Sequence, residues 1–134
     1  MANVYKNQGK YEEALAMYEK ALSIKLKKLG DDHPSVAMTY NNMAIVYEKQ
    51  GKYDEALRMY KKDLSISLKK LGDEHPDVAI TYNNMAYVYY NQDKYKEALD
   101  FFRKALKIWK AKLGDEHPKT KRVQGYVADM EAKV

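Results

Sequence analysis

The sequence predicts an all-α fold, a solenoid of antiparallel helix pairs, and three observations lead to this prediction. The chain of 134 residues repeats itself every 42 residues, and the segments 9–50 and 51–92 differ at only 11 of 42 aligned positions. Within each repeat, apolar residues recur at steps of three and four, which is the spacing of an amphipathic helix. Glycine and proline stand at fixed places, where helices end and begin. A unit of this size cannot bury its own apolar face, so successive units must stack.

The first part of each repeat predicts a long helix. In the segment 51–92, apolar residues from Tyr53 to Leu71 share one face, and Gly72 then supplies a left-handed C-terminal cap. Lysine pairs precede the capping glycines, where they complement the negative end of the helix dipole. We call these helices the second type and expect them at 11–29, 53–71 and 95–113.

The second part of each repeat predicts a shorter helix, the first type. Pro76 stands at the first helical position, after the turn that contains His75. Val78 and Met85 fall on one face, whereas Asn83 falls on the opposite arc with aromatic and aliphatic residues. We expect first-type helices at 34–49, 76–91 and 118–132, and residues 1–8 as the second half of one more.

We expect one repeat domain over residues 1–134. Its parts are a partial helix 1–8, the repeats 9–50, 51–92 and 93–118, and a C-terminal capping helix 119–134. The capping helix has a partly polar outer face, which is typical of the end of a repeat array. The start inside a helix is typical of a fragment of a longer array, and it leaves the outer side of the helix 11–29 only partly covered.

Composition restricts the functional classes. No run of apolar residues is long enough to span a bilayer, and the first residues lack the pattern of a secretory signal. The absence of cysteine excludes disulfides and thiolate metal sites, so we expect a cytoplasmic protein that does not contact a membrane. The net charge of +5 and pI of about 9.1 leave nucleic-acid binding as a minor alternative, because lysines at helix ends account for much of the charge.

No constellation of residues predicts catalysis or metal binding. His33, His75 and His117 lie one repeat apart, and stacked units are spaced by about 10 Å, the diameter of a helix. Zinc bonds to nitrogen are near 2 Å, so these histidines cannot share an ion, and a role at helix starts is favoured. There is no glycine-rich phosphate loop and no cysteine nucleophile. We therefore expect no enzyme, no cofactor and no metal.

The motif Tyr-Asn-Asn-Met-Ala-x-x-Tyr, followed by Gln-Gly-Lys-Tyr-x-Glu-Ala-Leu, resembles the tetratricopeptide repeat. The 42-residue period and the link Leu-Gly-Asp-(Asp/Glu)-His-Pro are similar to the longer repeat of kinesin light chains. The small and aromatic positions of the family are matched by Ala44, Tyr47, Gly51, Tyr53, Ala56 and Tyr60. The resemblance implies a right-handed superhelix whose concave wall is lined by first-type helices.

The resemblance also implies a protein–protein interaction module. Members of the family commonly hold an extended peptide in the concave groove, with asparagines fixing the peptide backbone. A carboxamide suits this role because it offers a donor and an acceptor together. The implied peptide-binding residues of one repeat are Asn41, Asn42, Ile45, Glu48 and Lys49. Those of the next repeat are Asn83, Asn84, Tyr87, Tyr90 and Asn91.

Three departures from the family pattern affect these expectations. Asp93 replaces the glycine between two helices and must adopt a left-handed conformation. Asp63 stands where the family packs an alanine such as Ala105, so its burial without a partner would make Asp63→Ala stabilising. The basic residues of members that clamp a terminal carboxylate are replaced by residues such as Asn41, which argues against recognition of a free C-terminus.

An alternative function is structural. Nearly identical repeats with unsealed ends can associate head to tail, and contacts of this kind that do not close produce filaments. Self-association would then depend on the ends of the chain, whereas peptide binding would depend on the asparagine-bearing helices.

Overall fold

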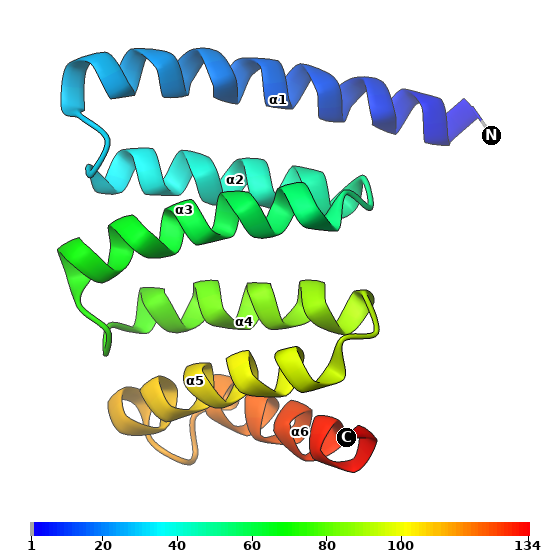
Figure 1. The fold of residues 1–134 in the computed structure, drawn as a ribbon, viewed down its shortest axis with the longest axis vertical. Helices are drawn as coiled ribbons and strands as arrows, with labels where there is room; N and C mark the ends of the chain where they lie inside the picture. Colours follow the sequence, from blue (N-terminus) through cyan, green and yellow to red (C-terminus); the bar gives the residue numbers. More distant parts are fainter. Residues whose placement is uncertain (1) are drawn as a thin grey trace. The chain divides into compact units, whose positions relative to one another are not determined.

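The computed structural model describes the backbone of residues 2–134 and the side chains from residue 9 onward, and this part of the chain is helical with short turns (Figure 1). The described helices are α1 (Ala2–Leu29), α2 (Pro34–Lys49), α3 (Tyr53–Leu71), α4 (Pro76–Asn91), α5 (Tyr95–Leu113) and α6 (Pro118–Lys133). The predicted all-α class is confirmed, and α2 to α5 have the predicted bounds.

The chain groups into two compact units, one ending at Ile66 and the other comprising Ser67–Val134. In the first unit α1 packs against α2, and in the second unit α5 packs against both α4 and α6. Successive helices within each unit run in opposite directions (Figure 1). The expected single repeat domain stays a prediction.

The first-type helices α2, α4 and α6 all begin at a histidine followed by proline. The Nδ1 atom of each histidine accepts a hydrogen bond from the backbone N–H two residues later, at 3.0 Å for His33 and 3.1 Å for His75 and His117. This bond satisfies a helix N–H that has no partner within the helix, and the following proline has no N–H to satisfy. The predicted role of the His-Pro pairs at helix starts is confirmed. Within the described residues, no group of three or more His, Cys, Asp or Glu side chains could hold a metal ion.

Helix α1 corrects one prediction. The turn expected at Gly9 and Lys10, between a partial helix 1–8 and a helix 11–29, is absent, because α1 runs without interruption from Ala2 to Leu29. Gly51, the equivalent of Gly9, turns the chain with a φ of 76°, whereas Gly9 does not adopt a left-handed φ. A segment of eight residues is too short to gain much from packing as a separate helix, and continuing the helix adds a backbone hydrogen bond with each residue.

Asp93 shows how a turn forms without glycine. Its φ is 62°, the left-handed conformation that the sequence predicts. The hydroxyl of Tyr95 donates a hydrogen bond to its carboxylate at 3.1 Å, which ties the turn to the first residue of α5. A short polar side chain that bonds locally makes this conformation accessible to a residue other than glycine.

The helices approach one another at alanine positions. Ala44 and Ala86 on first-type helices, and Ala56 and Ala98 on second-type helices, have no exposed surface. Larger core residues follow the predicted phase, as in the buried side chain of Met85. Small residues at these contacts allow the backbones to come close, and well-packed interiors tolerate little extra volume there.

Replacing Gly9 by alanine tests whether α1 is continuous. Nothing lies within 4 Å of an added Cβ, and alanine is favoured over glycine inside a helix, so Gly9→Ala should raise the free energy of unfolding by about 0.5–1 kcal/mol. Gly51→Ala is the matched control, because its left-handed φ should make the same change destabilising by about 1–2 kcal/mol. Thermal unfolding followed by circular dichroism compares the two variants. A loss of stability in both would show that the chain turns at Gly9.

Candidate functional site

The predicted peptide-binding residues of the first unit lie on α2. Four of them are partly buried and one is exposed. The partly buried ones are Asn41, Asn42, Ile45 and Glu48, and the exposed one is Lys49.

Asn41 is held by a partner inside the protein. Its Nδ2 atom donates a hydrogen bond to Oδ2 of Asp63 on α3 at 3.1 Å, and Asp63 is only 4% exposed. The Asp63 carboxylate on α3 therefore has a partner on α2. We expected Asp63→Ala to be stabilising only if this carboxylate were buried without a partner, so that expectation does not apply. Asn41 differs from the expectation for a peptide-binding asparagine, because its amide nitrogen already has a buried acceptor.

The neighbourhood of Asn41 is acidic. Burial raises the pKa of Glu48 above its ordinary value, with the nearby Lys49 acting in the opposite direction, and Oε1 of Glu48 is buried without a hydrogen-bond partner. Burial also raises the pKa of Tyr60, and the carboxylates of Glu48 and Asp63 raise it further. Two carboxyl groups, those of Glu48 and Asp63, therefore lie close enough to Tyr60 to affect it.

The predicted residues of the second unit lie on α4. Asn83, Asn84 and Tyr87 are partly buried, and Tyr90 and Asn91 are exposed. Three of them, Asn83, Tyr87 and Tyr90, line two pockets together with side chains of α5 and α6.

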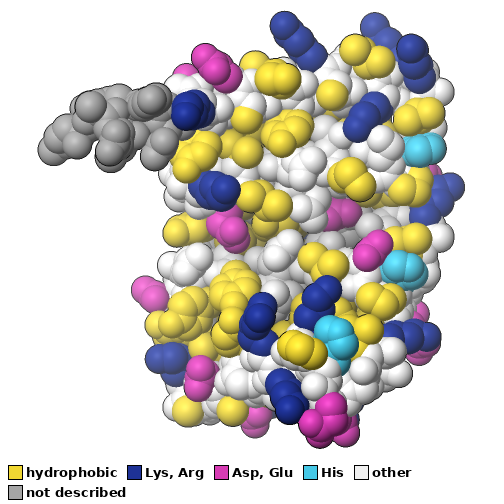
Figure 2. Space-filling view, turned by 180° about the vertical axis from the view of Figure 1, so that it is seen from behind, with side chains coloured by type: hydrophobic (Ala, Val, Ile, Leu, Met, Phe, Trp, Pro, Cys, Tyr) yellow, Lys and Arg dark blue, Asp and Glu magenta, His cyan; other side chains and the backbone are white. Residues whose placement is uncertain are grey.

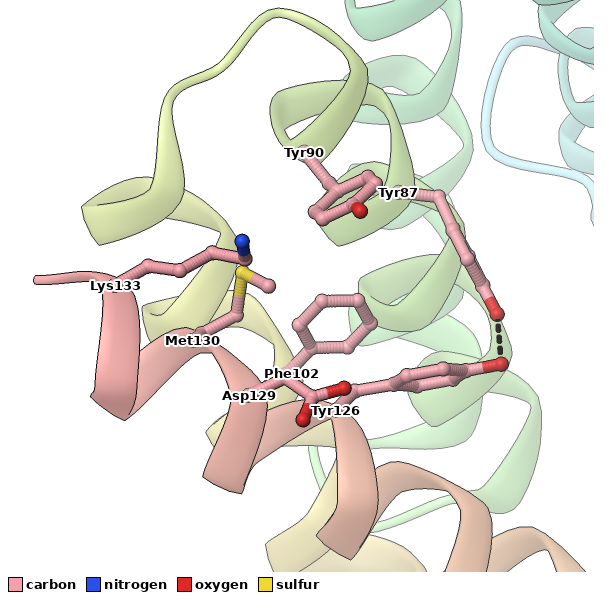
Figure 3. A pocket seen from close by; sticks show the side chains of 7 residues that line it. All are labelled: Tyr87, Tyr90, Phe102, Tyr126, Asp129, Met130 and Lys133. Carbon is pink, nitrogen blue, oxygen red and sulfur yellow. Dashed lines mark hydrogen bonds between the residues drawn. The ribbon is translucent and has the colours of Figure 1, made fainter.

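The first of these pockets, the aromatic pocket, has a volume of about 270 Å³ (Figure 3). The hydroxyl of Tyr87 donates a hydrogen bond to that of Tyr126, which joins α4 to α6. Both rings also pack on the buried Phe102, with centroids 5.7 Å and 5.1 Å from it. Burial, followed by the bond to Tyr126, raises the pKa of Tyr87 above the ordinary tyrosine value, which already lies well above neutral pH. The lining residues are Tyr87, Tyr90, Phe102, Tyr126, Asp129, Met130 and Lys133.

The second pocket, the basic pocket, has a volume of about 230 Å³. Two of its residues hold buried polar atoms without a hydrogen-bond partner, namely Oδ1 of Asn83 and Nε1 of Trp109. Trp109 is only 4% exposed, and Nζ of Lys119 lies 5.9 Å from its ring centroid. Buried polar groups in proteins are rarely left unpaired, so these two atoms single out the pocket. The lining residues are Ile80, Asn83, Trp109, Lys119, Arg122 and Val123.

The two pockets share the same three helices, and we refer to them together as the α4–α6 site. Helices α4 and α6 line the basic pocket from their N-terminal halves and the aromatic pocket from their C-terminal halves. Helix α5 runs in the opposite direction and supplies Trp109 to the basic pocket and Phe102 to the aromatic one. The bridge from Tyr87 to Tyr126 joins α4 to α6 within the wall of the aromatic pocket.

The residues of α5 and α6 in this site were missed by the sequence prediction, although the repeat contains a signal for them. Trp109 occupies the position of Ser67, and Arg122 occupies the position of Ile80. Tyr126 likewise stands where the preceding repeat has Asn84. Each is a place where the third repeat or the capping helix departs from the second repeat, and such departures point to residues that the fold alone does not require.

The arrangement of helix pairs defines an all-α repeat solenoid. The family model of the tetratricopeptide repeat matches residues 1–69, 37–111 and 77–133. The chain therefore belongs to the tetratricopeptide repeat family. Proteins of this family are in general protein–protein interaction modules and not enzymes.

Solved structures share the fold. A kinesin-light-chain-type protein of Podosopora anserina with nearly identical TPR-like repeats is 26% identical with a TM-score of 0.79, and the match covers 96% of this chain and 61% of that one. BtubC (BKLC) from P. vanneervenii is 22% identical with a TM-score of 0.82, covering 98% and 52%. The N-terminal domain of stress-induced protein-1 (STI-1) from C. elegans is 22% identical with a TM-score of 0.65, covering 92% and 87%.

The predicted similarity to kinesin-light-chain repeats is confirmed by these matches. The chain spans 61% and 52% of the length of the first two structures. No curated protein matches the chain significantly.

Figure 2 shows basic and acidic side chains interspersed with hydrophobic ones on one face, so the described residues form no broad basic patch there. None of the described helices is long and apolar enough to cross a membrane.

A pair of asparagine variants tests the structural role assigned to Asn41. Asn41→Ala leaves the buried Asp63 without this partner and should lower the free energy of unfolding by about 1–3 kcal/mol. Asn83→Ala is the matched control, because Ala105 replaces the carboxylate in that repeat, and its effect should stay within about ±0.5 kcal/mol. Chemical denaturation measures both. Equal effects of the two substitutions would contradict a specific role for the Asn41–Asp63 bond.

Proposed function

We propose that this chain binds an extended segment of a protein partner, and that the α4–α6 site holds part of that segment. Support comes from the family, whose repeats serve in general for protein–protein interaction, and from two adjacent pockets of side-chain size. The lack of cysteines favours a cytoplasmic setting for such a module.

The observation that carries the proposal is the buried, unpaired Oδ1 atom of Asn83. An acceptor removed from water without a partner is unfavourable, and a backbone N–H of a bound segment would satisfy it. Asn41, which occupies the same phase one repeat earlier, differs because it is bonded to Asp63. The two asparagines therefore have separate roles, with Asn83 assigned to the partner and Asn41 to the fold.

The aromatic pocket supplies the apolar part of the interaction. Tyr90 is 40% exposed, and the ring of Phe102 lies buried beneath the pocket. Aromatic residues around a cavity of this size typically hold one large side chain of a partner and contribute much of the binding energy. The bridge from Tyr87 to Tyr126 holds two of the walls in place before binding.

In the first unit we assign a similar role to the remaining predicted residues of α2. They surround Asn41 on the same arc of the helix and are partly or fully exposed. These residues are Asn42, Ile45, Glu48 and Lys49. On α4, Asn84 and Asn91 complete the proposed set.

Selection from a library of random 12-residue peptides tests the proposal. Peptides that bind the wild-type chain should bind the folded Asn83→Ala variant about fivefold more weakly, since one hydrogen bond contributes about 1 kcal/mol. Tyr90→Ala should weaken binding at least as much, because it removes a wall of the aromatic pocket. Asp100→Ala on the exposed side of α5 is the matched control. Fluorescence polarisation measures the affinities, and peptides that bind all three variants equally would place the binding surface elsewhere.

A second candidate function, self-association, is favoured by the exposed apolar face of α1. Met17 is 71% and Ile24 is 55% exposed, whereas the equivalent residues of the next repeat, Met59 and Ile66, are 8% and 5% exposed. Ile66 is covered by α2 residues in the first unit. A second copy of the chain could cover Met17 and Ile24 in the same way.

The outer face of α6 makes head-to-tail contact less favourable than contact between two α1 helices. Lys121 and Glu131 are exposed there, at positions where the preceding repeat has Ala79 and Tyr89. Burying these charged groups and their ion-pair partners, Glu116 and Arg103, against an apolar face would remove them from water at a cost in desolvation.

Sedimentation velocity over a range of protein concentrations tests self-association. The double variant Met17→Lys/Ile24→Lys should raise the dissociation constant at least about tenfold, because it replaces apolar contact with charge. Lys121→Ala on α6 serves as the control and should have little effect. A wild-type chain that sediments as a monomer at every concentration would remove this candidate.

A further inference from the structure

We propose that the basic pocket binds the side-chain carboxylate of an aspartate or glutamate in the partner segment. The inference rests on the proposed function of the α4–α6 site and specifies its ligand chemistry. Three groups around the pocket carry it, namely the indole N–H of Trp109 and the cationic groups of Lys119 and Arg122.

The indole of Trp109 supplies a buried donor. Trp109 is only 4% exposed, and its Nε1 carries a hydrogen that has no acceptor among the described residues. An indole nitrogen can only donate, so an incoming group must be an acceptor. An acceptor that carries negative charge forms the stronger bond, and a carboxylate oxygen meets both requirements.

Lys119 and Arg122 supply positive charge beside this donor. They lie on α6 three residues apart and therefore on neighbouring positions of one helix face. Ion pairs found elsewhere in the second unit engage other cations, such as Lys121 with Glu116 and Arg103 with Glu131. Among the described residues, neither Lys119 nor Arg122 forms an ion pair, so both remain available for a ligand carboxylate. A guanidinium can bind a carboxylate through two parallel hydrogen bonds.

The same chemistry is not repeated along the chain. At the equivalent positions one repeat earlier stand Ser67, Asp77 and Ile80, so the donor, the lysine and the arginine are all replaced. An aspartate in the place of Lys119 would repel a carboxylate. Recognition of an acidic residue is therefore assigned to α5 and α6, where Trp109, Lys119 and Arg122 depart from the repeat pattern.

An internal acidic residue fits the pocket better than a C-terminal carboxylate. Oδ1 of Asn83 is an acceptor and needs a donor, while Nε1 of Trp109 is a donor and needs an acceptor. An aspartate or glutamate within a segment offers both at once, a backbone N–H and a carboxylate on a flexible side chain. The segment can then continue past the pocket in both directions.

The test uses the peptides selected from the random 12-residue library against the wild-type chain. We expect the selected sequences to be enriched in aspartate or glutamate at one position. Replacing that residue by asparagine or glutamine should weaken binding at least tenfold, and amidation of the peptide C-terminus should leave it unchanged. Arg122→Glu should weaken binding of the acidic peptide and favour the same peptide with lysine at that position.

Trp109→Phe tests the donor, because it removes the indole N–H together with the five-membered ring and keeps one buried six-membered aromatic ring. The folded variant should bind the acidic peptide several-fold more weakly, with no change for the neutral form. Arg122→Gln is a milder exposed variant if Arg122→Glu does not fold.

The outcomes distinguish this inference from the proposed function. If Asn83→Ala and Tyr90→Ala weaken binding but the acid-to-amide change does not, the site binds peptides and the carboxylate assignment is wrong. If amidation abolishes binding, the pocket takes a terminal carboxylate, and the inference is overturned. If no peptide is selected, both the proposed function and the inference are contradicted.

Discussion

Close contact between helices at alanine positions is the constraint on which the rest of this structure depends. Ala44, Ala56, Ala86 and Ala98 are completely buried, and their small side chains set how near the backbones lie. Asp63 breaks this rule, and the amide of Asn41 compensates by donating a hydrogen bond to the buried carboxylate. The compensation has a functional consequence, because an asparagine on the predicted binding face of α2 becomes part of the fold.

Two asparagines in the same phase of the repeat therefore differ in chemistry for a reason that lies on another helix. Asn41 is bonded to Asp63. In the next repeat the position of Asp63 is taken by Ala105, and Asn83 keeps a buried oxygen without a partner. Trp109 and Arg122 add to this difference in the second unit. The repeat provides a uniform scaffold, and the binding chemistry that we propose lies where individual repeats depart from one another.

The sequence predicted those features that depend on local chemistry. The His-Pro starts, the turn at Asp93 and the bounds of α2 to α5 follow from residues that act within one turn of the chain. It did not predict the uninterrupted α1 or the bond between Asn41 and Asp63. Periodicity gives the face on which a side chain lies, but not the residue that meets it from a neighbouring helix. The pocket residues of α5 and α6 were missed for the same reason.

The bridge between Tyr87 and Tyr126 links the fold to the proposed binding. It joins helices that are separated in sequence by the whole of α5, and both rings rest on Phe102. The pKa of a tyrosine lies well above neutral pH and burial raises that of Tyr87 further, so the hydroxyl keeps its proton and the bridge remains a hydrogen bond. A receptor whose walls are fixed in this way loses little conformational entropy when a segment binds. In the proposed binding mode these two tyrosines both line the aromatic pocket and hold α4 and α6 in position before a segment binds.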